Sequence, residues 1–339
     1  MTTLPTVIIQ IACLDEAETL PATIADLPTA LPGVGRLEYL VVDDGSTDDT
    51  VEVARRCGVH HVVSHDRNRG LAAAFLTGLD HALRLGADVV VNTDADNQYA
   101  GADVAKLVEP VLAGRADLVV GERPIESIDG FSRTKKLLQR LGSSVVRFFS
   151  GTEVRDAASG FRAMSREAAL RLHVFGRYTY TMETLIQAGW EGLTVTSVPI
   201  SVNPATRPSR LVRSIPQYLW RSSQAIVRSF VLYKPFRFFA VLGAIPTLIG
   251  VALLARWLVL YAIEDEYTSR LPSLLTGIGC VLVGVQLWAV AFLADLQAAN
   301  RRLVADVRVR MRERQLADAT GDVEIVLSNP VLEPVRRTS

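Results

Sequence analysis

The sequence has little of what marks several common protein classes. Only three of its 339 residues are cysteines, and Cys13, Cys57 and Cys280 have the spacing of neither a disulfide framework nor a zinc site. Basic and acidic residues balance at 36 each, so no overall field favours nucleic acid as a partner. No basic stretch precedes the short apolar run near the N-terminus, and we expect no signal peptide there.

Motifs of two nucleotide-binding folds and of a histidine metal site are also missing. No G-x-G-x-x-G and no Walker A pattern follows a predicted strand, which argues against dinucleotide-binding and P-loop folds. The five histidines match no metal-ligand pattern, and we expect them to be solvated or to cap helices: His60, His61, His65, His81 and His173.

The chain up to about Gly121 alternates apolar β-branched runs with helical patterns. Such strand–helix–strand repeats predict an α/β domain with a mostly parallel sheet and helices on both faces. The predicted helices are Thr50–Cys57 and Leu71–Leu85. The predicted buried strands are Val7–Ile11, Leu37–Val42, Val62–Ser64, Val89–Thr93 and Leu118–Gly121.

Acidic residues follow three of these predicted strands. Ligands of parallel α/β sheets bind beyond the carboxyl ends of the strands, so the three pairs predict a ligand site at that edge. The pairs are Asp15 and Glu16, Asp43 and Asp44, and Asp94 and Asp96.

The run after Val89–Thr93 carries the most specific chemistry. Asp94 and Asp96 lie one residue apart and are followed by Gln98. Hard oxygen ligands at this spacing suit Mg²⁺ or Mn²⁺, which bridge nucleotide phosphates. An EF-hand begins similarly but requires glycine where this chain has Tyr99. Asp94 and Asp96 therefore predict a site for a metal-bound nucleotide.

Around the end of Leu37–Val42 the sequence predicts a strand, then a tight turn and then the start of a helix. Either Ser46 or Asp48 is a candidate cap for the following helix. Asp43 or Asp44 is then free to accept hydrogen bonds from the base or ribose of a nucleotide.

The mean hydropathy of the whole chain is +0.24. Its long apolar runs are confined to the last third of the chain. Phe238–Ile263 and Ser273–Asp295 are each long enough to cross a bilayer, which takes roughly 20 apolar residues. Basic residues flank the pair and the short loop between them is acidic, which predicts a hairpin with both termini in the cytosol. The alternative is two buried core helices. The charges are Arg221, Arg228, Lys234 and Arg237 before the pair, Glu264, Asp265, Glu266 and Arg270 in the loop, and Arg301, Arg302, Arg308 and Arg310 after it.

Between the two parts, Leu211–Tyr233 mixes large apolar residues with arginines. This composition is typical of a helix at the membrane interface, and an ordinary packed amphipathic helix is the alternative. The tail after about Gln315 is polar and aperiodic, and we expect it to be poorly ordered.

Several motifs together resemble a known enzyme family. Ile11-Ala-Cys-Leu-Asp-Glu, the Asp-Asp-Gly-Ser turn, Asp94-Ala-Asp-Asn-Gln and Gly121-Glu-Arg resemble the inverting family 2 glycosyltransferases of GT-A fold. Asp156-Ala-Ala-Ser-Gly-Phe-Arg, Glu183, Thr206-Arg-Pro-Ser-Arg-Leu and the two apolar runs are similar to the polyprenyl-phosphate glycosyltransferases. The resemblance extends to about Arg314.

The resemblance implies a role for each matching residue. Asp96, Arg123 and Asp156 would be catalytic, with Asp156 facing the sugar or the acceptor. The metal would be held by Asp94, Asp96 and Gln98. Donor or phosphate contacts would come from Ala12, Leu14, Glu16, Asp44, Asp94, Arg207 and Arg210, with Arg123 also aimed at a phosphate. The chain departs from the family pattern at Ala12, Asp15 and Asn97, where proline, asparagine and leucine are usual.

The resemblance also implies a function. We expect metal-dependent, inverting transfer of a hexose from a nucleotide-diphosphate sugar to a polyprenyl phosphate, with UDP-hexose favoured and GDP-mannose as the alternative. We expect a homo-oligomer with a cytosolic catalytic domain over residues 1–210, interfacial helices over 211–237, a hairpin over 238–298 in the inner (plasma) membrane, and a cytosolic helix and flexible tail over 299–339.

Two rival functions are less well supported. A processive polysaccharide synthase usually carries Gln-x-x-Arg-Trp, but Gln217-Tyr-Leu-Trp-Arg has the last two residues exchanged, and two spans are few for a channel. A catalytically silent nucleotide-sugar sensor in the membrane is disfavoured because Asp94, Asp96 and Asp156 are all present.

Overall fold

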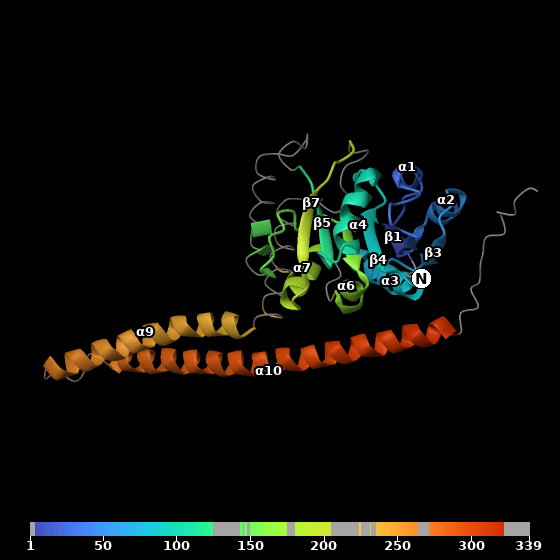
Figure 1. Cartoon of the computed structure of the whole chain (residues 1–339). Helices are drawn as coiled ribbons and strands as arrows, with labels where there is room; N and C mark the ends of the chain where they lie inside the picture. The colour runs from blue at the N-terminus through green and yellow to red at the C-terminus, as the bar shows by residue number, and fades with distance from the viewer. Residues whose placement is uncertain are drawn as a thin grey trace, which may run out of the picture.

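A mixed sheet of seven strands forms the centre of the N-terminal part of the chain (Figure 1). The computed structural model describes residues 4–124, 143–144, 146–147, 150–174, 180–204, 224, 231, 235–263 and 271–321. Among these residues the strand order is β3-β2-β1-β4-β6-β5-β7, with β6 antiparallel to β4 and β5 and every other pairing parallel. The strands are β1 (Thr6–Cys13), β2 (Arg36–Asp43), β3 (His61–Ser64), β4 (Val89–Asp94), β5 (Leu118–Glu122), β6 (Arg162–Ser165) and β7 (Val195–Pro199).

Alternate residues of the strands pack against helices on opposite faces of the sheet, because successive strand side chains point to opposite sides. On β1, Val7, Ile9 and Ile11 belong to one buried cluster and Ile8 to the other. The first cluster includes α1 (Leu20–Asp26), α2 (Thr50–Arg56) and α4 (Val104–Leu112), which follows the short 3₁₀ turn η1 (Gly101–Asp103). The second includes α3 (Leu71–Arg84), α6 (Arg166–Arg171) and α7 (Thr181–Trp190).

The α/β domain predicted from the sequence is confirmed. All five predicted strands are present, and both predicted helices end one residue earlier than expected, at Arg56 and Arg84. Strands β6 and β7 are not predicted from the sequence. Neither has a continuous apolar run: β6 has a fully buried arginine at its start, and β7 is only partly buried.

The two long C-terminal helices lie side by side as a hairpin (Figure 1). They are α9 (Pro235–Ile263) and α10 (Leu271–Gly321). The most apolar windows of α9 and α10 have mean hydropathies of 2.3 and 2.1, and only 11% and 17% of these windows is buried. A core helix of a soluble protein would be mostly buried, so the alternative of two buried core helices is disfavoured. By length and composition, both helices are able to cross a membrane.

Glycines allow α9 and α10 to approach closely. A β-carbon on Gly250 would lie 2.7 Å from the carbonyl oxygen of Gly277, and one on Gly284 would lie 2.9 Å from that of Gly243. The glycines are spaced seven residues apart on each helix, so they recur on the same face. Small residues at such positions are typical of helix pairs within membranes.

Helix α10 continues past the predicted span end at Asp295 and reaches the α/β domain (Figure 1). Its far part contacts α3 and α6, where Val309 and Leu316 pack against the buried cluster that contains α3, α6 and α7. Arg312 Nη2 lies 3.4 Å from Asp80 Oδ1 on α3. One uninterrupted helix therefore connects the apolar hairpin to the domain.

Several sequence-based predictions lie outside the described residues. These are Arg207 and Arg210, the acidic loop 264–270, nearly all of the interfacial stretch Leu211–Tyr233, and most of the predicted tail, from 322 on. The first residues of that tail, up to Gly321, are not irregular as expected but continue helix α10.

Candidate active site

The loops that follow β1 and β2 are tied to each other. Asp15 Oδ1 accepts a hydrogen bond of 2.7 Å from the Thr47 amide, and the Asp15 amide donates to Ser46 Oγ at 2.9 Å. The Glu16 amide donates to Thr50 Oγ1 at 2.8 Å. Because β1 lies between β2 and β4 in the sheet, these contacts bring all three acidic loops to one edge, as predicted.

The acidic pair after β2 is buried and bonded to its own chain. Asp43 Oδ1 accepts from the Ser46 amide at 3.0 Å. Asp44 Oδ1 contacts His65 Nδ1 at 2.7 Å and accepts from the Arg69 amide at 2.9 Å, while its Oδ2 accepts from the Gly70 amide at 2.8 Å. Asp44 therefore anchors the segment that leads into α3. Its predicted contact with the nucleoside stays a prediction.

Neither candidate cap of α2, Ser46 or Asp48, is its N-cap residue, which is Asp49 and makes no side-chain cap hydrogen bond. The nearest side-chain contact comes from Asp48. Its Oδ1 accepts from the Thr50 amide at 3.0 Å, at the start of α2. Ser46 instead joins the loop after β1.

Asp94 and Asp96 lie at the end of β4, as the sequence predicts. Burial, followed by the neighbouring charge of Asp96, raises the pKa of Asp94 from 3.8 to about 7. The turn between them and Gln98 passes through Asn97, which has a φ of +54°, and the Gln98 amide donates to Asp96 Oδ1 at 3.2 Å. Two ionised carboxylates repel each other, and a divalent cation relieves that repulsion, so the residues fit the predicted metal.

A tyrosine and a glycine enclose Asp94. The Gly160 amide donates to Tyr99 Oη at 3.0 Å, and Tyr99 stacks on Phe161 with ring centroids 5.0 Å apart. Burial and the nearby Asp94 carboxylate raise the pKa of Tyr99 to about 12, so its hydroxyl keeps its proton near neutral pH. A β-carbon on Gly160 would lie 3.0 Å from Asp94 Oδ1 and 3.1 Å from its Oδ2. Only glycine therefore leaves ordinary contact distances to this carboxylate.

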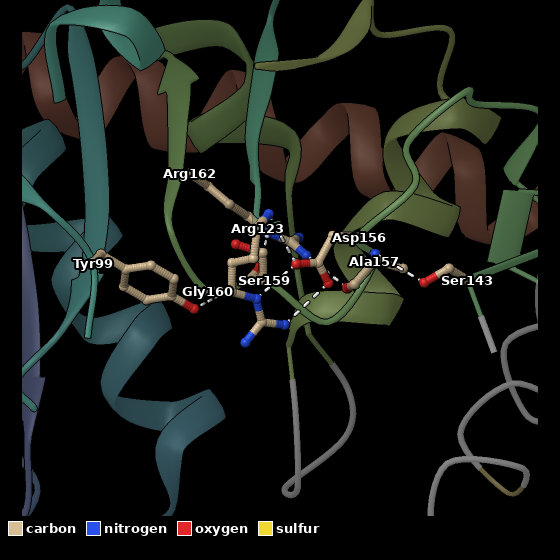
Figure 2. Close-up of polar contacts among 8 residues, drawn as sticks. All are labelled: Tyr99, Arg123, Ser143, Asp156, Ala157, Ser159, Gly160 and Arg162. Atoms are coloured by element: carbon tan, nitrogen blue, oxygen red, sulfur yellow. Dashed lines mark hydrogen bonds and ion pairs between the residues drawn. The ribbon is translucent and has the colours of Figure 1, made fainter. Parts of the chain in front are cut away.

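Arg123 and Asp156 form a two-pronged ion pair beside this cluster (Figure 2). Arg123 Nε donates to Asp156 Oδ2 at 2.7 Å and Nη2 donates to Oδ1 at 3.0 Å. The Asp156 side chain is fully buried, and that of Arg123 is 16% exposed. Burial opposes the charge of Arg123, but Tyr99 and the carboxylates Asp156 and Asp94 raise its pKa above the ordinary value. Arg123 is thus a fixed cation whose Nη1 has no hydrogen-bond partner among the described residues.

The structure brings most of the predicted residues together. Ala12 is paired with Asp94 in the sheet register, and the charge of Glu16 acts on Asp94. Leu14 follows β1 directly. Arg207 and Arg210 lie outside the described residues. The predicted catalytic and metal residues Asp94, Asp96, Arg123 and Asp156 surround Tyr99 and Gly160.

Sequence reasoning missed the residues that support this cluster. The sequence used Tyr99 only to argue against an EF-hand, and it contained Arg162 only as the last residue of a motif, so no role was predicted for either residue. A buried arginine has no sequence pattern of its own. Only the position of Gly160 in the Asp156–Arg162 motif signals a close backbone approach.

Carboxylates after three neighbouring parallel strands, beside an anchored arginine, define a site of the kind found in nucleotide-sugar transferases. A family model for glycosyl transferase family 2 matches residues 8–172. Polyprenol monophosphomannose synthase from Mycolicibacterium smegmatis is 31% identical over 198 residues, which cover 55% of this chain and 73% of that protein. The chain belongs to glycosyl transferase family 2 and is a glycosyltransferase.

A second relative agrees with this family, and a solved structure agrees with the fold. UDP-N-acetylglucosamine–dolichyl-phosphate N-acetylglucosaminyltransferase from Methanococcus voltae is 34% identical over 184 residues, 48% of this chain and 72% of that protein. Glucosyl-3-phosphoglycerate synthase from Mycobacterium tuberculosis, crystallised with Mn²⁺, UDP and glucosyl-3-phosphoglycerate, is 24% identical with a TM-score of 0.53 over 67% of this chain and 79% of that chain. The latter likeness confirms the GT-A fold.

Proposed function

We propose that the protein transfers a hexose from a nucleotide-diphosphate sugar to a polyprenyl phosphate at the cytosolic face of a membrane. UDP-hexose is the favoured donor and GDP-mannose the alternative. The observation that carries the proposal is the juxtaposition of the Asp94–Asp96 pair with Arg123, whose Nη1 is available to a phosphate. The names of the two relatives, which act on polyprenol or dolichyl phosphate, support the acceptor class.

Asp94 and Asp96, with Gln98, would hold Mg²⁺ or Mn²⁺. No group of three or more His, Cys, Asp or Glu suited to a metal occurs among the described residues, so the donor diphosphate and water would supply further ligands. When bound, the ion neutralises the negative charge that grows on the departing nucleotide. The Mn²⁺ and UDP in the structure of glucosyl-3-phosphoglycerate synthase support this pairing of metal and nucleotide.

Arg123 would stabilise the same charge from the protein side. Its Nε and Nη2 are held by Asp156, which leaves Nη1 to donate to a phosphate oxygen. Since a fixed cation needs little reorganisation when charge develops, it favours the transition state over the bound donor. In this arrangement both oxygens of Asp156 are bonded to Arg123, so Asp156 would orient Arg123 rather than remove a proton.

The acceptor itself makes a strong general base unnecessary. A phosphomonoester has a second pKa of about 6, so the lipid phosphate is largely ionised near neutral pH. In-line attack of its oxygen on the anomeric carbon forms the new bond as the bond to the nucleotide diphosphate breaks, which inverts the configuration at that carbon.

The acceptor phosphate would be bound by Arg207 and Arg210, which lie at the end of the predicted catalytic domain, just before the predicted interfacial stretch. Arginine offers paired donors matched to phosphate oxygens. Arg210→Ala should lower the efficiency with polyprenyl phosphate on the order of a hundredfold, while donor affinity changes little. Initial rates against acceptor concentration, paired with donor calorimetry, test this. Collapse of donor affinity with unchanged acceptor dependence would place these arginines at the diphosphate instead.

The membrane topology is part of the proposal. The arginine bias around α9 and α10 favours both termini in the cytosol, with the catalytic domain on the same side. Tags on the two termini of the protein in sealed vesicles should be reached by protease only from the cytosolic side. A tail accessible from the opposite side would contradict the hairpin.

The function is tested with a panel of nucleotide sugars, each offered undecaprenyl or dolichyl phosphate, and the products are identified by mass. We expect one sugar to be transferred to the lipid phosphate, with loss of turnover in EDTA and in Asp96→Ala. Transfer that persists in both would refute the metal assignment. A polymeric product would identify a processive synthase, and donor binding without any product would identify a sensor.

A further inference from the structure

Arg162 is a positively charged side chain that is fully buried next to the Arg123–Asp156 pair (Figure 2). It lies on β6, between β4 and β5. Its Nε donates to the Ser159 carbonyl at 2.8 Å, Nη2 donates to the Ala157 carbonyl at 3.0 Å, and Nη1 donates to Thr184 Oγ1 on α7 at 2.7 Å. The guanidinium carbon lies 6.0 Å from the Tyr180 ring centroid.

The partners of Arg162 set it apart from an ordinary buried ion pair. Among the described residues, no carboxylate lies within ion-pair distance of its guanidinium, and its three hydrogen bonds end on two carbonyls and a hydroxyl. Burial lowers the pKa of Arg162 to about 10, which still leaves it charged near neutral pH. Burying a charge is unfavourable, and an apolar side chain would fill the same volume without that cost. An apolar residue, however, would not donate hydrogen bonds to the two inward-facing carbonyls.

Those two carbonyls belong to the loop from Asp156 to Gly160, which carries active-site contacts at both ends. At its first residue, Asp156 holds Arg123 through two hydrogen bonds. At its last residue, the Gly160 amide bonds Tyr99, and the Gly160 α-carbon faces the Asp94 carboxylate. Arg162 forms hydrogen bonds to the loop between these ends. The position of Arg162 therefore determines where the loop places Arg123 and Tyr99.

We propose that Arg162 is a positioning residue, which fixes the loop 156–160 and thereby aims Arg123 at the reacting phosphates and holds Tyr99 against Asp94. Thr184 is its anchor on α7, because the Thr184 hydroxyl accepts from Arg162 and itself donates to the Tyr180 carbonyl at 2.8 Å. The effect on turnover rests on the proposed function; the effect on the loop does not.

The test removes the anchor rather than the arginine, because Arg162→Met leaves two buried carbonyls unpaired and risks loss of the fold. In Thr184→Val the valine side chain has nearly the same shape as that of threonine but offers Arg162 no hydrogen-bond acceptor. Thr184→Ser keeps the hydroxyl and is the conservative rescue. Ile186→Val, on the same helix and 2% exposed, should lower stability without removing a hydrogen-bond partner of Arg162 and is the matched control. Arg162→Lys keeps the charge without the planar fork.

Two quantities are measured on the full chain in detergent or nanodiscs. Hydrogen exchange of the peptide covering 156–162 should rise about tenfold in Thr184→Val and more in Arg162→Lys, while exchange of β4 stays unchanged. With the donor identified by the panel, kcat should fall about tenfold in Thr184→Val and on the order of a hundredfold in Arg162→Lys, with KM for the donor within about twofold. Thr184→Ser and Ile186→Val should match the unsubstituted protein in both quantities.

Each result decides the proposal. Faster loop exchange with a selective fall in kcat supports it, and faster exchange with unchanged kcat overturns the positioning role. Unchanged exchange overturns it too, whether or not kcat falls. Equal losses in Ile186→Val would show a general effect of stability and also refute it. If the unsubstituted protein transfers no sugar to polyprenyl phosphate, the proposed function fails, while the exchange result still decides whether Arg162 holds the loop.

Discussion

Two loops of the candidate site turn at residues that tolerate a left-handed backbone. Asp15 has a φ of +53° and Asn97 a φ of +54°. Asparagine and aspartate adopt this conformation more readily than other non-glycine residues. Both are positions at which the chain departs from the family pattern. Asn97 therefore suits the local backbone better than the usual leucine, whereas at position 15 the usual asparagine would suit it equally well. Asp15 also ties the loops after β1 and β2 together.

At Gly160 a single methyl group is expected to disturb the proposed metal site. In Gly160→Ala the new β-carbon would press on both oxygens of Asp94 and on Tyr180 Oη. We expect Mn²⁺–UDP to bind about tenfold more weakly, as is usual when a group that orients a metal ligand is displaced. Calorimetry measures this. Ser159→Ala is the control, since the buried Ser159 Oγ has no hydrogen-bond partner among the described residues; equal weakening in both variants would contradict the explanation.

Asp94 makes the free energy of unfolding of the metal-free protein depend on pH, and the direction of that dependence follows from the pKa of Asp94. Its pKa is about 7 in the fold and about 4 when unfolded, so between these values only the folded state holds the proton. The contribution of Asp94 to the free energy of unfolding is therefore complete below pH about 4 and falls as pH rises to about 7. Thermal unfolding in EDTA should show this decline, and Asp94→Asn should flatten it. Added Mn²⁺ should oppose it by binding the ionised form. An identical pH profile for Asp94→Asn would refute the assignment.

The candidate site could be predicted from the sequence only where its chemistry is local. Asp94, Asp96 and Gln98 lie within five residues and follow a recognisable strand, so their grouping follows from strand geometry alone. The pair of Arg123 and Asp156 joins residues 33 positions apart, and the bond of Gly160 to Tyr99 joins residues 61 apart. Such contacts depend on the strand order, which no local pattern encodes.

The antiparallel strand β6 is the element on which the site depends most and which the sequence signals least. It inserts between β4, which ends at Asp94, and β5, which ends just before Arg123. Its first residue, Arg162, is charged, and only Ala163 and Met164 between the ends are apolar. Four of the five predicted strands, β1, β2, β4 and β5, have longer apolar runs that are mostly buried, which is why periodicity found them. The fifth, β3, is short and only partly buried.

The hairpin of α9 and α10 is expected to depend on its glycines. Gly284→Leu would place a side chain against Thr247 and the Gly243 carbonyl, so the two helices would have to separate. We expect a loss of roughly 1–3 kcal/mol in the free energy of unfolding in detergent. Gly279→Leu is the matched control on the same helix, because nothing lies within 4 Å of a β-carbon there. Equal losses in both variants would show that close packing is not the cause.

At the scale of the whole molecule, the far part of α10 has one face against the domain and another exposed. Val309 packs against the buried cluster beneath α3 and α6, whereas Val307 is 52% exposed. Val309→Ala would remove apolar contact with this cluster and should loosen this part of α10, raising its hydrogen exchange about tenfold. Val307→Ala should have no such effect. If both variants exchange at the unsubstituted rate, the contact between α10 and the domain does not stabilise the helix.

The continuity of α10 has a mechanical consequence. A helix rises about 1.5 Å per residue, so the part beyond Asp295 extends about 39 Å from the predicted span. Transmembrane helices tilt to match the bilayer, and a tilt change of about 10° would move the far end of such a lever by about 7 Å. That displacement exceeds the length of a hydrogen bond more than twofold. The thickness of the surrounding lipid would then affect the enzyme, because it would alter the distance between the active site and the phosphate that it must reach.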